Sequence, residues 1–287
     1  LILDLEQKAK QYKSIPMMSR THGQPASPTT AGKEFVNFAW RILQETNIID
    51  QAKVQAKING ATGNYNAHHF VYPEINWIQA SQRFVSNYLK LEPILFTTQV
   101  NPNHSIAFIL HAMIRAAATI IDFDRDMWGY ISLGYFTQRV KKGETGSSTM
   151  PHKINPIQFE NAEGNMGIAN ALLNHLSMKL PISRMQRDLT DSTTLRNQGV
   201  AMGHSYLALQ NILKGLGRIT INKTQMSAEL NNHWEVLGEA IQTILRKNGK
   251  QDAYEQLKSL TQGQSITADS MSKFVSELNI SDEDKKA

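Results

Sequence analysis

Two long helical patterns are separated by the polar stretch Gly146-Ser147-Ser148-Thr149-Met150-Pro151-His152-Lys153-Ile154-Asn155-Pro156. Nearly every residue in it is small, polar, basic or a helix breaker, so the stretch predicts a loop and not a packed element. Its hydroxyls, its backbone N–H groups and the Lys153 cation are the groups needed to hold and deprotonate an anionic substrate. Pro156 can open the next helix at its first position. We therefore expect an active-site loop between two core helices.

Apolar residues on both sides of this loop recur with helical spacing, whereas the alternation typical of strands is scarce. The spacing predicts long helices over residues 29–58, 73–91, 103–135, 156–178 and 191–216. The third of these is apolar on most sides in its first half, which is typical of a helix inside a bundle. Its apolar run over 105–121 is slightly short for a membrane span and contains Arg115, so we expect a buried core helix. The predicted fold class is all-α, a long-helix bundle.

The composition changes after Gly217, where shorter and more highly charged amphipathic segments follow. These segments predict a smaller C-terminal helical domain over residues 217–287, next to a central bundle domain over residues 1–216. Its expected helices cover residues 233–246, 253–260 and 267–278. The chain begins with Leu1 and not with Met, so we expect that its natural N-terminal part is missing. Separately, the C-terminal domain is interpreted as one that could be cut short at Ala287.

The overall composition excludes several classes of protein. With 287 residues, 41% of them hydrophobic and 19% charged, the chain is typical of a globular protein with a large core. Its net charge of +5 is mild, and no basic run with interleaved aromatic residues indicates a nucleic-acid surface. The lack of cysteine excludes disulfides, thiolate catalysis and Cys-ligated zinc, and it fits a cytoplasmic location. His68 and His69 lack ligand spacing, so we expect no metal site there.

A second chemical stretch is Ser19-Arg20-Thr21-His22-Gly23-Gln24-Pro25-Ala26-Ser27-Pro28. Its prolines and its glycine keep it out of a helix, which predicts that His22 projects from a stiff loop. A histidine in such a loop can donate a proton near neutral pH. Taken by itself, a loop histidine is more often structural or merely solvated, so this stretch gains meaning only beside the serine-rich loop.

A third stretch is Gln186-Arg187-Asp188-Leu189-Thr190-Asp191-Ser192-Thr193-Thr194-Leu195-Arg196. Asp191 or Ser192 can cap a helix here, and Arg196 would lie one turn along from Ser192 on the same face. A helix start with a hydroxyl and two guanidinium groups predicts a phosphate site. An ordinary cap with a surface ion pair is the alternative for this segment alone.

The three stretches together resemble a known family. Gly-Ser-Ser-x-Met-Pro-x-Lys-x-Asn-Pro resembles the signature loop of the fumarase/aspartase superfamily, whose members eliminate fumarate without a metal or organic cofactor. The other two stretches, Thr-His-Gly-Gln-Pro-Ala and Arg-Asp-Leu-Thr-Asp-Ser followed by Arg, resemble the bacterial adenylosuccinate lyase family within it. The resemblance implies a homotetramer of helical bundles in which each active site combines residues from three subunits. It also implies an N-terminal domain that supplies another histidine and part of the nucleotide pocket.

The resemblance further implies a role for each matching residue. Ser147 matches the general base and His22 the general acid of an elimination that converts adenylosuccinate to AMP, and SAICAR to AICAR, with release of fumarate. From chemistry alone, either Ser147 or Ser148 could be the base. The positions that match substrate contacts are Thr21, Gln99, Ser148, Lys153, Asn155, Asn161, Arg187, Ser192, Thr193 and Arg196. No metal, organic cofactor, nucleic acid or membrane is implied as a partner.

Two alternatives remain open from the sequence. Another lyase of the superfamily, acting on argininosuccinate, malate or aspartate, would share the serine loop but would have no use for a phosphate cluster around Arg187. A structural lens protein of the same fold is the second alternative. A purely structural chain has no physical need for the full set of Ser147, Lys153, Asn155 and His22.

Overall fold

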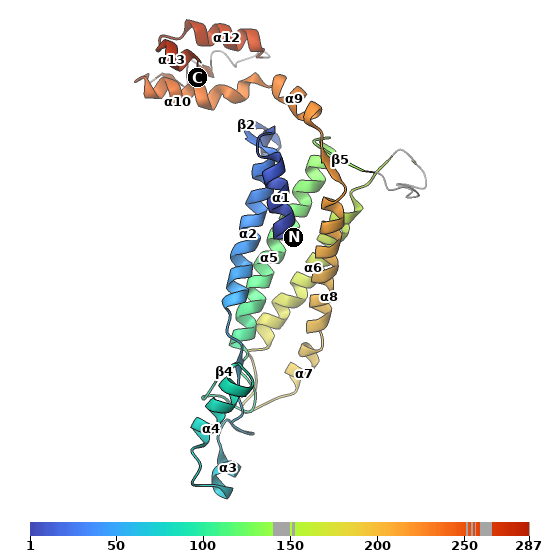
Figure 1. The fold of residues 1–287 in the computed structure, drawn as a ribbon, viewed down its shortest axis with the longest axis vertical. Helices are drawn as coiled ribbons and strands as arrows, with labels where there is room; N and C mark the ends of the chain where they lie inside the picture. The colour runs from blue at the N-terminus through green and yellow to red at the C-terminus, as the bar shows by residue number, and fades with distance from the viewer. Residues whose placement is uncertain are drawn as a thin grey trace. The chain divides into compact units, whose positions relative to one another are not determined.

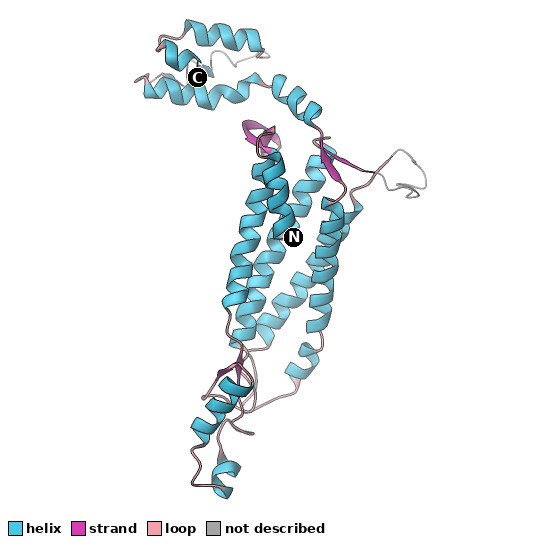
Figure 2. Cartoon of the chain, in the orientation of Figure 1, coloured by secondary structure: helices cyan, strands magenta, loops and turns pink. Residues whose placement is uncertain are grey.

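The computed structural model describes residues 1–139, 150, 153–250, 252, 253, 255, 257, 258 and 266–286. Most of the predicted loop around Ser147 and half of the predicted helix over 253–260 lie outside these residues. The predicted all-α class is confirmed, because helices dominate and the strands are few and short (Figure 2). The chain forms two compact units. The first unit consists of Leu1–Asp4, Asn37–Gly129 and Gln138–Ile219, and the second consists of Leu5–Val36, Tyr130–Thr137 and Thr220–Ala287. The predicted domain boundary after residue 216 stays a prediction.

Long helices form the body of the first unit (Figure 1), namely α2 (Ala31–Gln51), α5 (His104–Ser132), α6 (Ile157–Lys179) and α8 (Gln198–Leu216). Leu110 of α5, Leu173 of α6 and Ala201 of α8 belong to one buried cluster, so these three helices share a core. Phe123 of α5 meets Phe38 of α2 edge-on, with 5.2 Å between ring centroids, and this contact joins α2 to the bundle. The bundle follows from apolar residues at helical spacing on each helix.

Among the described residues, α5 is the one helix long and apolar enough to cross a membrane by length and composition. Core helices of soluble proteins share both properties. In this structure α5 buries Leu110, Phe123 and Met127, each at most 1% exposed. One face of α5 therefore lies in the core of the first unit, whereas Phe108 on another face is 54% exposed.

Several predicted helix ends were wrong. The helix predicted over 29–58 ends at Gln51, because the chain then extends into β3 (Gln55–Ala56), which pairs with β4 (Glu92–Pro93) in parallel. The helix predicted over 73–91 is α4 (Trp77–Arg83), capped by the side chain of Asn76, and it continues as a π-helix over Phe84–Tyr88. A short helix, α3 (Asn66–Val71), was not predicted.

The second unit holds a β-hairpin where the sequence predicts a loop. Strands β1 (Pro16–Thr21) and β2 (Gln24–Thr30) pair antiparallel. The same unit contains helix α1 (Ile2–Tyr12) from Leu5 onward and the start of α2 up to Val36. Phe35 of α2 stacks on Phe136 at 5.7 Å between ring centroids, and both side chains are buried. These rings anchor β5 (Phe136–Gln138), which pairs with β6 (Ile219–Ile221).

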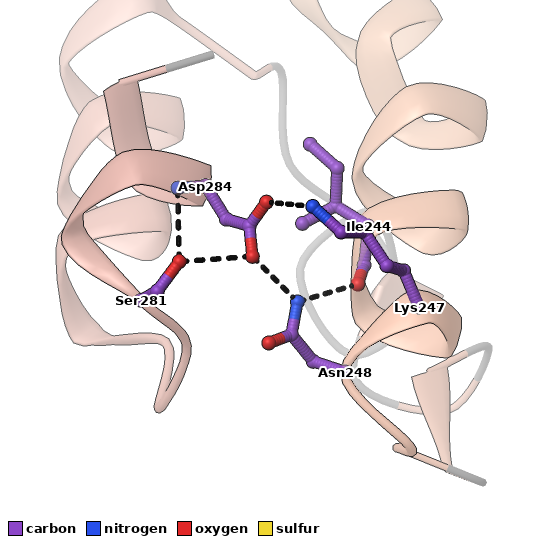
Figure 3. Close-up of polar contacts among 5 residues, drawn as sticks. All are labelled: Ile244, Lys247, Asn248, Ser281 and Asp284. Atoms are coloured by element: carbon purple, nitrogen blue, oxygen red, sulfur yellow. Dashed lines mark hydrogen bonds and ion pairs between the residues drawn. The ribbon is translucent and has the colours of Figure 1, made fainter.

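The C-terminal part of the second unit is helical, with α9 (Lys223–Asn231), a 3-10 turn over Trp234–Leu237, α10 (Gly238–Lys247), α12 (Ala268–Glu277) and α13 (Asp282–Lys286). Leu245 of α10 and Met271 of α12 belong to one buried cluster. Asp284 of α13 accepts hydrogen bonds from Lys247 at 2.7 Å and from Asn248 at 2.9 Å (Figure 3). The side-chain hydrogen bond from Lys247 is the main cause that lowers the pKa of Asp284 to about 2. The carboxylate thus fastens α13 to the end of α10.

Asp124 of α5 is a buried carboxyl group in the first unit. Its side chain is 1% exposed, and neither oxygen has a hydrogen-bond partner within the part of the chain that the structure describes. Burial, reinforced by the charge of Glu163, raises its pKa from 3.8 to about 9. The folded chain therefore keeps a proton that the unfolded chain releases above the ordinary pKa. The contribution of Asp124 to stability is complete at acidic pH and is lost as pH rises toward the folded pKa.

We expect Asp124→Asn to be more stable than the wild-type chain at neutral and mildly alkaline pH. Asparagine has the same shape but cannot ionise, so the variant avoids a loss of up to about 1.4 kcal/mol per pH unit above the ordinary pKa. Urea unfolding at about pH 5, 6.5 and 8 measures this difference. The matched control is Asp122→Asn, which removes an exposed carboxylate that pairs with Arg41 at 2.7 Å. It should change stability by less than about 1 kcal/mol, and the same pH dependence in both variants would contradict the role of Asp124.

Candidate active site

The signature loop is described only in part. Ser147 and Ser148, predicted as base and substrate contact, lie outside the described residues. Lys153 is exposed, and its backbone N–H donates to the Met150 carbonyl at 3.0 Å. Asn155 is half-buried. The carbonyl of the preceding residue, Ile154, accepts a hydrogen bond from the Gln138 side chain at 3.1 Å. Pro156 caps α6 instead of occupying its first position, so the predicted helix start was wrong by one residue.

Gln99 lies in a segment that is held from two sides. Its backbone N–H donates to the carbonyl of Gln186 at 3.1 Å, which links it to the residue before Arg187. The ammonium group of Lys57 donates to the carbonyls of Gln99 at 2.8 Å, Thr98 at 2.9 Å and Gly60 at 2.9 Å. Burial lowers the pKa of Lys57. With its backbone fixed in this way, the exposed side chain of Gln99 is free to contact a ligand.

The side chain of Asn59 holds the segment that leads to Gln99 through hydrogen bonds. Its side chain is fully buried, and its amide nitrogen donates to the carbonyls of Leu95 at 2.9 Å and Gly63 at 3.1 Å. Its amide oxygen accepts a hydrogen bond from the Thr97 hydroxyl at 2.9 Å. All polar groups of a buried amide are thereby satisfied, as buried polar groups must be. The segment that carries Gln99 is therefore rigidly positioned.

We expect Lys57→Met to lower both the stability of the chain and the affinity of the full-length protein for its substrate. Methionine keeps the apolar stem but removes three donors, so the free energy of unfolding should fall by about 1–2 kcal/mol. In the full-length protein KM should rise more than kcat falls, because Gln99 loses its fixed backbone. Urea unfolding and steady-state kinetics measure the two effects. Lys53→Met, at an exposed lysine nearby, is the control; equal behaviour of the two variants would argue against a role for Lys57.

The third predicted stretch forms α7 (Thr190–Leu195) and the turn before it. Neither Asp191 nor Ser192 caps this helix; the carboxylate of Asp188 accepts from the Thr190 backbone N–H at 2.8 Å. Its hydrogen bonds with Thr190 lower the pKa of Asp188. The cap prediction was wrong because the helix starts before Asp191 and already includes both residues.

The two arginines of this stretch are exposed, whereas Asp188 and Asp191 are half-buried. Arg187 and Arg196 are exposed, Ser192 is half-buried and Thr193 is exposed. The helix predicted over 191–216 is broken here, since Arg196 and Asn197 separate α7 from α8. A cavity of ≈ 480 Å³ lies between the segment that carries Gln99 and the one that leads to Arg187, and it is lined in part by Thr98 and Met185.

Asn161 lies in the second turn of α6 and is exposed. Its amide oxygen accepts hydrogen bonds from Asn165, one turn along α6, at 3.0 Å and from Asn211 of α8 at 2.8 Å. The predicted contact residue is thus part of a polar network between the two helices.

His22 lies at the tip of the β1–β2 hairpin and is exposed, as is Thr21. His22 has φ 53° and Gly23 has φ 76°, which is the paired left-handed backbone of a tight two-residue turn. Arg20 donates to the Gly23 carbonyl at 2.9 Å and also forms an ion pair with Glu229 of α9. The guanidinium group therefore ties the turn that carries His22 to a helix of the same unit.

Tyr135 is buried in this unit with 0% exposure. Burial raises the pKa of its hydroxyl to about 12. The hydroxyl therefore stays protonated at neutral pH next to the Arg20 and Glu229 pair.

The predicted site residues fall into two groups. Gln99, Lys153, Asn155, Asn161 and the stretch around Arg187 belong to the first unit, and Thr21 and His22 belong to the second. The sequence reasoning missed the roles of Lys57 and Arg20. Arg20 lies in the second quoted stretch and Lys57 lies in none of the three, and only their contacts in the structure reveal what the two residues hold. No group of three or more His, Asp or Glu side chains among the described residues could hold a metal ion.

Comparisons with known proteins identify the family of this chain. The family model described as "Lyase" matches residues 1–171, which is more than half of the chain. The chain belongs to the lyase family. A second model, "Adenylosuccinate lyase C-terminal", matches residues 183–287 of this lyase. The two models together match all of the chain except residues 172–182.

Curated relatives of this chain are named adenylosuccinate lyase. The chain is 50% identical over 285 residues to the adenylosuccinate lyase of Haemophilus influenzae, covering 99% of this chain and 62% of that protein. It is 49% identical over 285 residues to the adenylosuccinate lyase of Escherichia coli K12, with the same coverage. The chain thus spans about three fifths of the length of these curated relatives. The resemblance that the sequence motifs indicate is confirmed.

The fold of this lyase is shared more widely. The 3-carboxy-cis,cis-muconate lactonizing enzyme from Pseudomonas putida matches with a TM-score of 0.75, covering 99% of this chain and 65% of that one. Its sequence is only 19% identical, so this likeness concerns the fold alone. The helical bundle predicted from the sequence is confirmed by this neighbour.

Proposed function

We propose that this lyase is an adenylosuccinate lyase, which eliminates fumarate from adenylosuccinate to give AMP and from SAICAR to give AICAR in purine nucleotide biosynthesis. The observation that carries the proposal is the 50% identity to named adenylosuccinate lyases over nearly the whole chain. The three motif stretches around Ser147, His22 and Arg187 agree with it. A lyase that acts on argininosuccinate, malate or aspartate would have no use for the phosphate cluster.

In the proposed reaction, Ser147 removes a proton from the carbon next to one carboxylate of the succinyl group. The carbon–nitrogen bond on the neighbouring carbon then breaks, and fumarate leaves. His22 gives a proton to the departing nitrogen, so the proton taken by the base is balanced by the proton that the amine receives. The carbanion is stabilised as a doubly charged carboxylate, for which Lys153, Asn155 and the loop amides supply a cation and donors.

In this proposal, polar residues at the positions that match substrate contacts hold the rest of the substrate. Arg187, Ser192, Thr193 and Arg196 supply guanidinium and hydroxyl donors of the kind that bind phosphate and ribose oxygens. Gln99 and Asn161 supply amide groups, Ser148 a hydroxyl, and Thr21 lies next to the proposed acid. No step of the proposed reaction needs a metal or organic cofactor.

We propose further that the protein works as a homotetramer in the cytoplasm, with each active site shared between subunits. Many large apolar side chains on the described helices are exposed in the single chain, among them Trp40 at 62%, Phe108 at 54% and Leu207 at 51%. Exposed apolar faces on a bundle are typical of helices that pack against other subunits.

An ultraviolet assay for the conversion of adenylosuccinate to AMP tests the proposal. It is run on the 287-residue chain and on the full-length protein, and parallel reactions with argininosuccinate, malate and aspartate are followed by fumarate. We expect activity with adenylosuccinate in the full-length protein. Activity only with another succinyl substrate would redirect the assignment within the superfamily, and no fumarate from a folded tetramer would indicate a structural protein.

A further inference from the structure

A chain of amide side chains connects α6 and α8 around Asn161. Asn165 Nδ2 donates to the Asn161 Oδ1 at 3.0 Å, and Asn211 Nδ2 donates to the same oxygen at 2.8 Å. His204 Nδ1 lies 2.8 Å from Asn165 Oδ1. The four residues stand on facing surfaces of the two helices, and all belong to the first unit.

The orientation of two of these amides is fixed by backbone carbonyls. Asn165 Nδ2 lies 2.9 Å from the carbonyl oxygen of Asn161, and Asn211 Nδ2 lies 2.9 Å from that of Leu207. A carbonyl oxygen can only accept a hydrogen bond, so the atom that faces it must be the NH₂ group of each asparagine. The two amides are therefore not free to exchange oxygen and nitrogen.

The fixed amides determine the orientation of a third one. Each NH₂ group has a second hydrogen, and both of these hydrogens point to the same side-chain atom of Asn161, which must then be its oxygen. Because the oxygen of Asn165 faces His204, the Nδ1 atom of that ring carries a proton. Both acceptor positions of Asn161 Oδ1 are occupied. Among the residues that the structure describes, nothing accepts a hydrogen bond from Asn161 Nδ2, and the side chain is exposed.

We propose that Asn165 and Asn211 are positioning residues that leave Asn161 only its N–H groups for the substrate, so that Asn161 selects a hydrogen-bond acceptor such as a carboxylate oxygen. The inference rests on the proposed function, in which Asn161 contacts the substrate. An unrestrained asparagine could rotate to meet a donor or an acceptor, whereas this one would lose two hydrogen bonds on rotation. Each net hydrogen bond of about 1 kcal/mol corresponds to about a fivefold preference for one orientation.

Substitutions in the full-length protein distinguish positioning from packing. Asn211→Ala removes one of the two donors, and we expect KM for adenylosuccinate to rise about fivefold with little change in kcat. Asn211→Asp keeps the shape but replaces the donor with an acceptor, which favours the rotated amide of Asn161. We therefore expect Asn211→Asp to raise KM at least as much as Asn211→Ala. A residue needed only for packing would show the reverse order, because aspartate fills the space that alanine leaves empty.

Asn161→Asp tests the substrate contact itself, because it replaces the Nδ2 group, which would donate to the substrate, with a carboxylate oxygen. We expect a larger rise in KM than for either Asn211 variant. Asn174→Ala, at an exposed asparagine elsewhere on α6, is the control and should leave KM and kcat unchanged. If the wild type is active and Asn211→Asp behaves like Asn174→Ala, the positioning role is wrong and the proposed function stands. A folded wild type that turns over none of the succinyl substrates would instead overturn both.

Discussion

Ser147→Ala in the full-length protein is expected to abolish turnover of adenylosuccinate while leaving substrate binding largely intact. The serine is proposed as the general base, and removing a positioned base typically costs about 10²- to 10⁴-fold in rate. Its hydroxyl supplies little of the binding energy, which should come from the residues around Arg187 and from the succinyl contacts of Lys153 and Asn155. Steady-state kinetics and calorimetric titration with adenylosuccinate measure the two effects separately.

Ser148→Ala is the matched control for this prediction. Chemistry alone allows either serine of the pair to be the base, and only the resemblance to the superfamily selects Ser147. If the selection is right, Ser148→Ala should mainly raise KM, because Ser148 is proposed as a substrate contact. Unchanged turnover in Ser147→Ala would remove this residue from the mechanism, and a greater loss in Ser148→Ala would transfer the role to its neighbour.

The fold could be predicted where local periodicity decides it. The apolar spacing along α5 and α6 is visible in the sequence, and burial of Phe123 and Phe159 follows from it. The β-hairpin could not be predicted in this way, because Pro25 and Pro28 are breakers in the middle of a sheet. A two-stranded hairpin has edges on both sides, so the prolines of β2 need not donate to a ladder.

The candidate site could be predicted only at the level of motifs. Arg187 and His22 were proposed because they stand in recognisable stretches, and their roles stay predictions. The supports of the site depend on contacts between distant parts of the chain, such as Lys57 with the carbonyl of Gln99 and Asn211 with Asn161. Neither contact has a signature in local spacing, since an amide or an ammonium group can find a carbonyl anywhere in the fold.

His22→Asn in the full-length protein is the second large effect that we expect. Asparagine tolerates the left-handed backbone that His22 adopts, at φ 53°, so the turn held by Arg20 and Gly23 should persist. An amide cannot give up a proton to the departing nitrogen, and loss of a general acid typically costs about 10²- to 10⁴-fold in rate. The fall should appear in kcat with little change in KM, as measured by the ultraviolet assay.

The choice of asparagine separates the chemistry of His22 from the geometry of its turn. Alanine at this position would strain the left-handed backbone, so a loss of activity in His22→Ala could come from a distorted hairpin. With asparagine, the free energy of unfolding should stay within about 0.5 kcal/mol of the wild-type value, as for other exposed positions. His175→Asn, at an exposed histidine of α6, controls for the loss of an imidazole elsewhere. A stable His22→Asn variant with wild-type kcat would show that another group protonates the leaving amine.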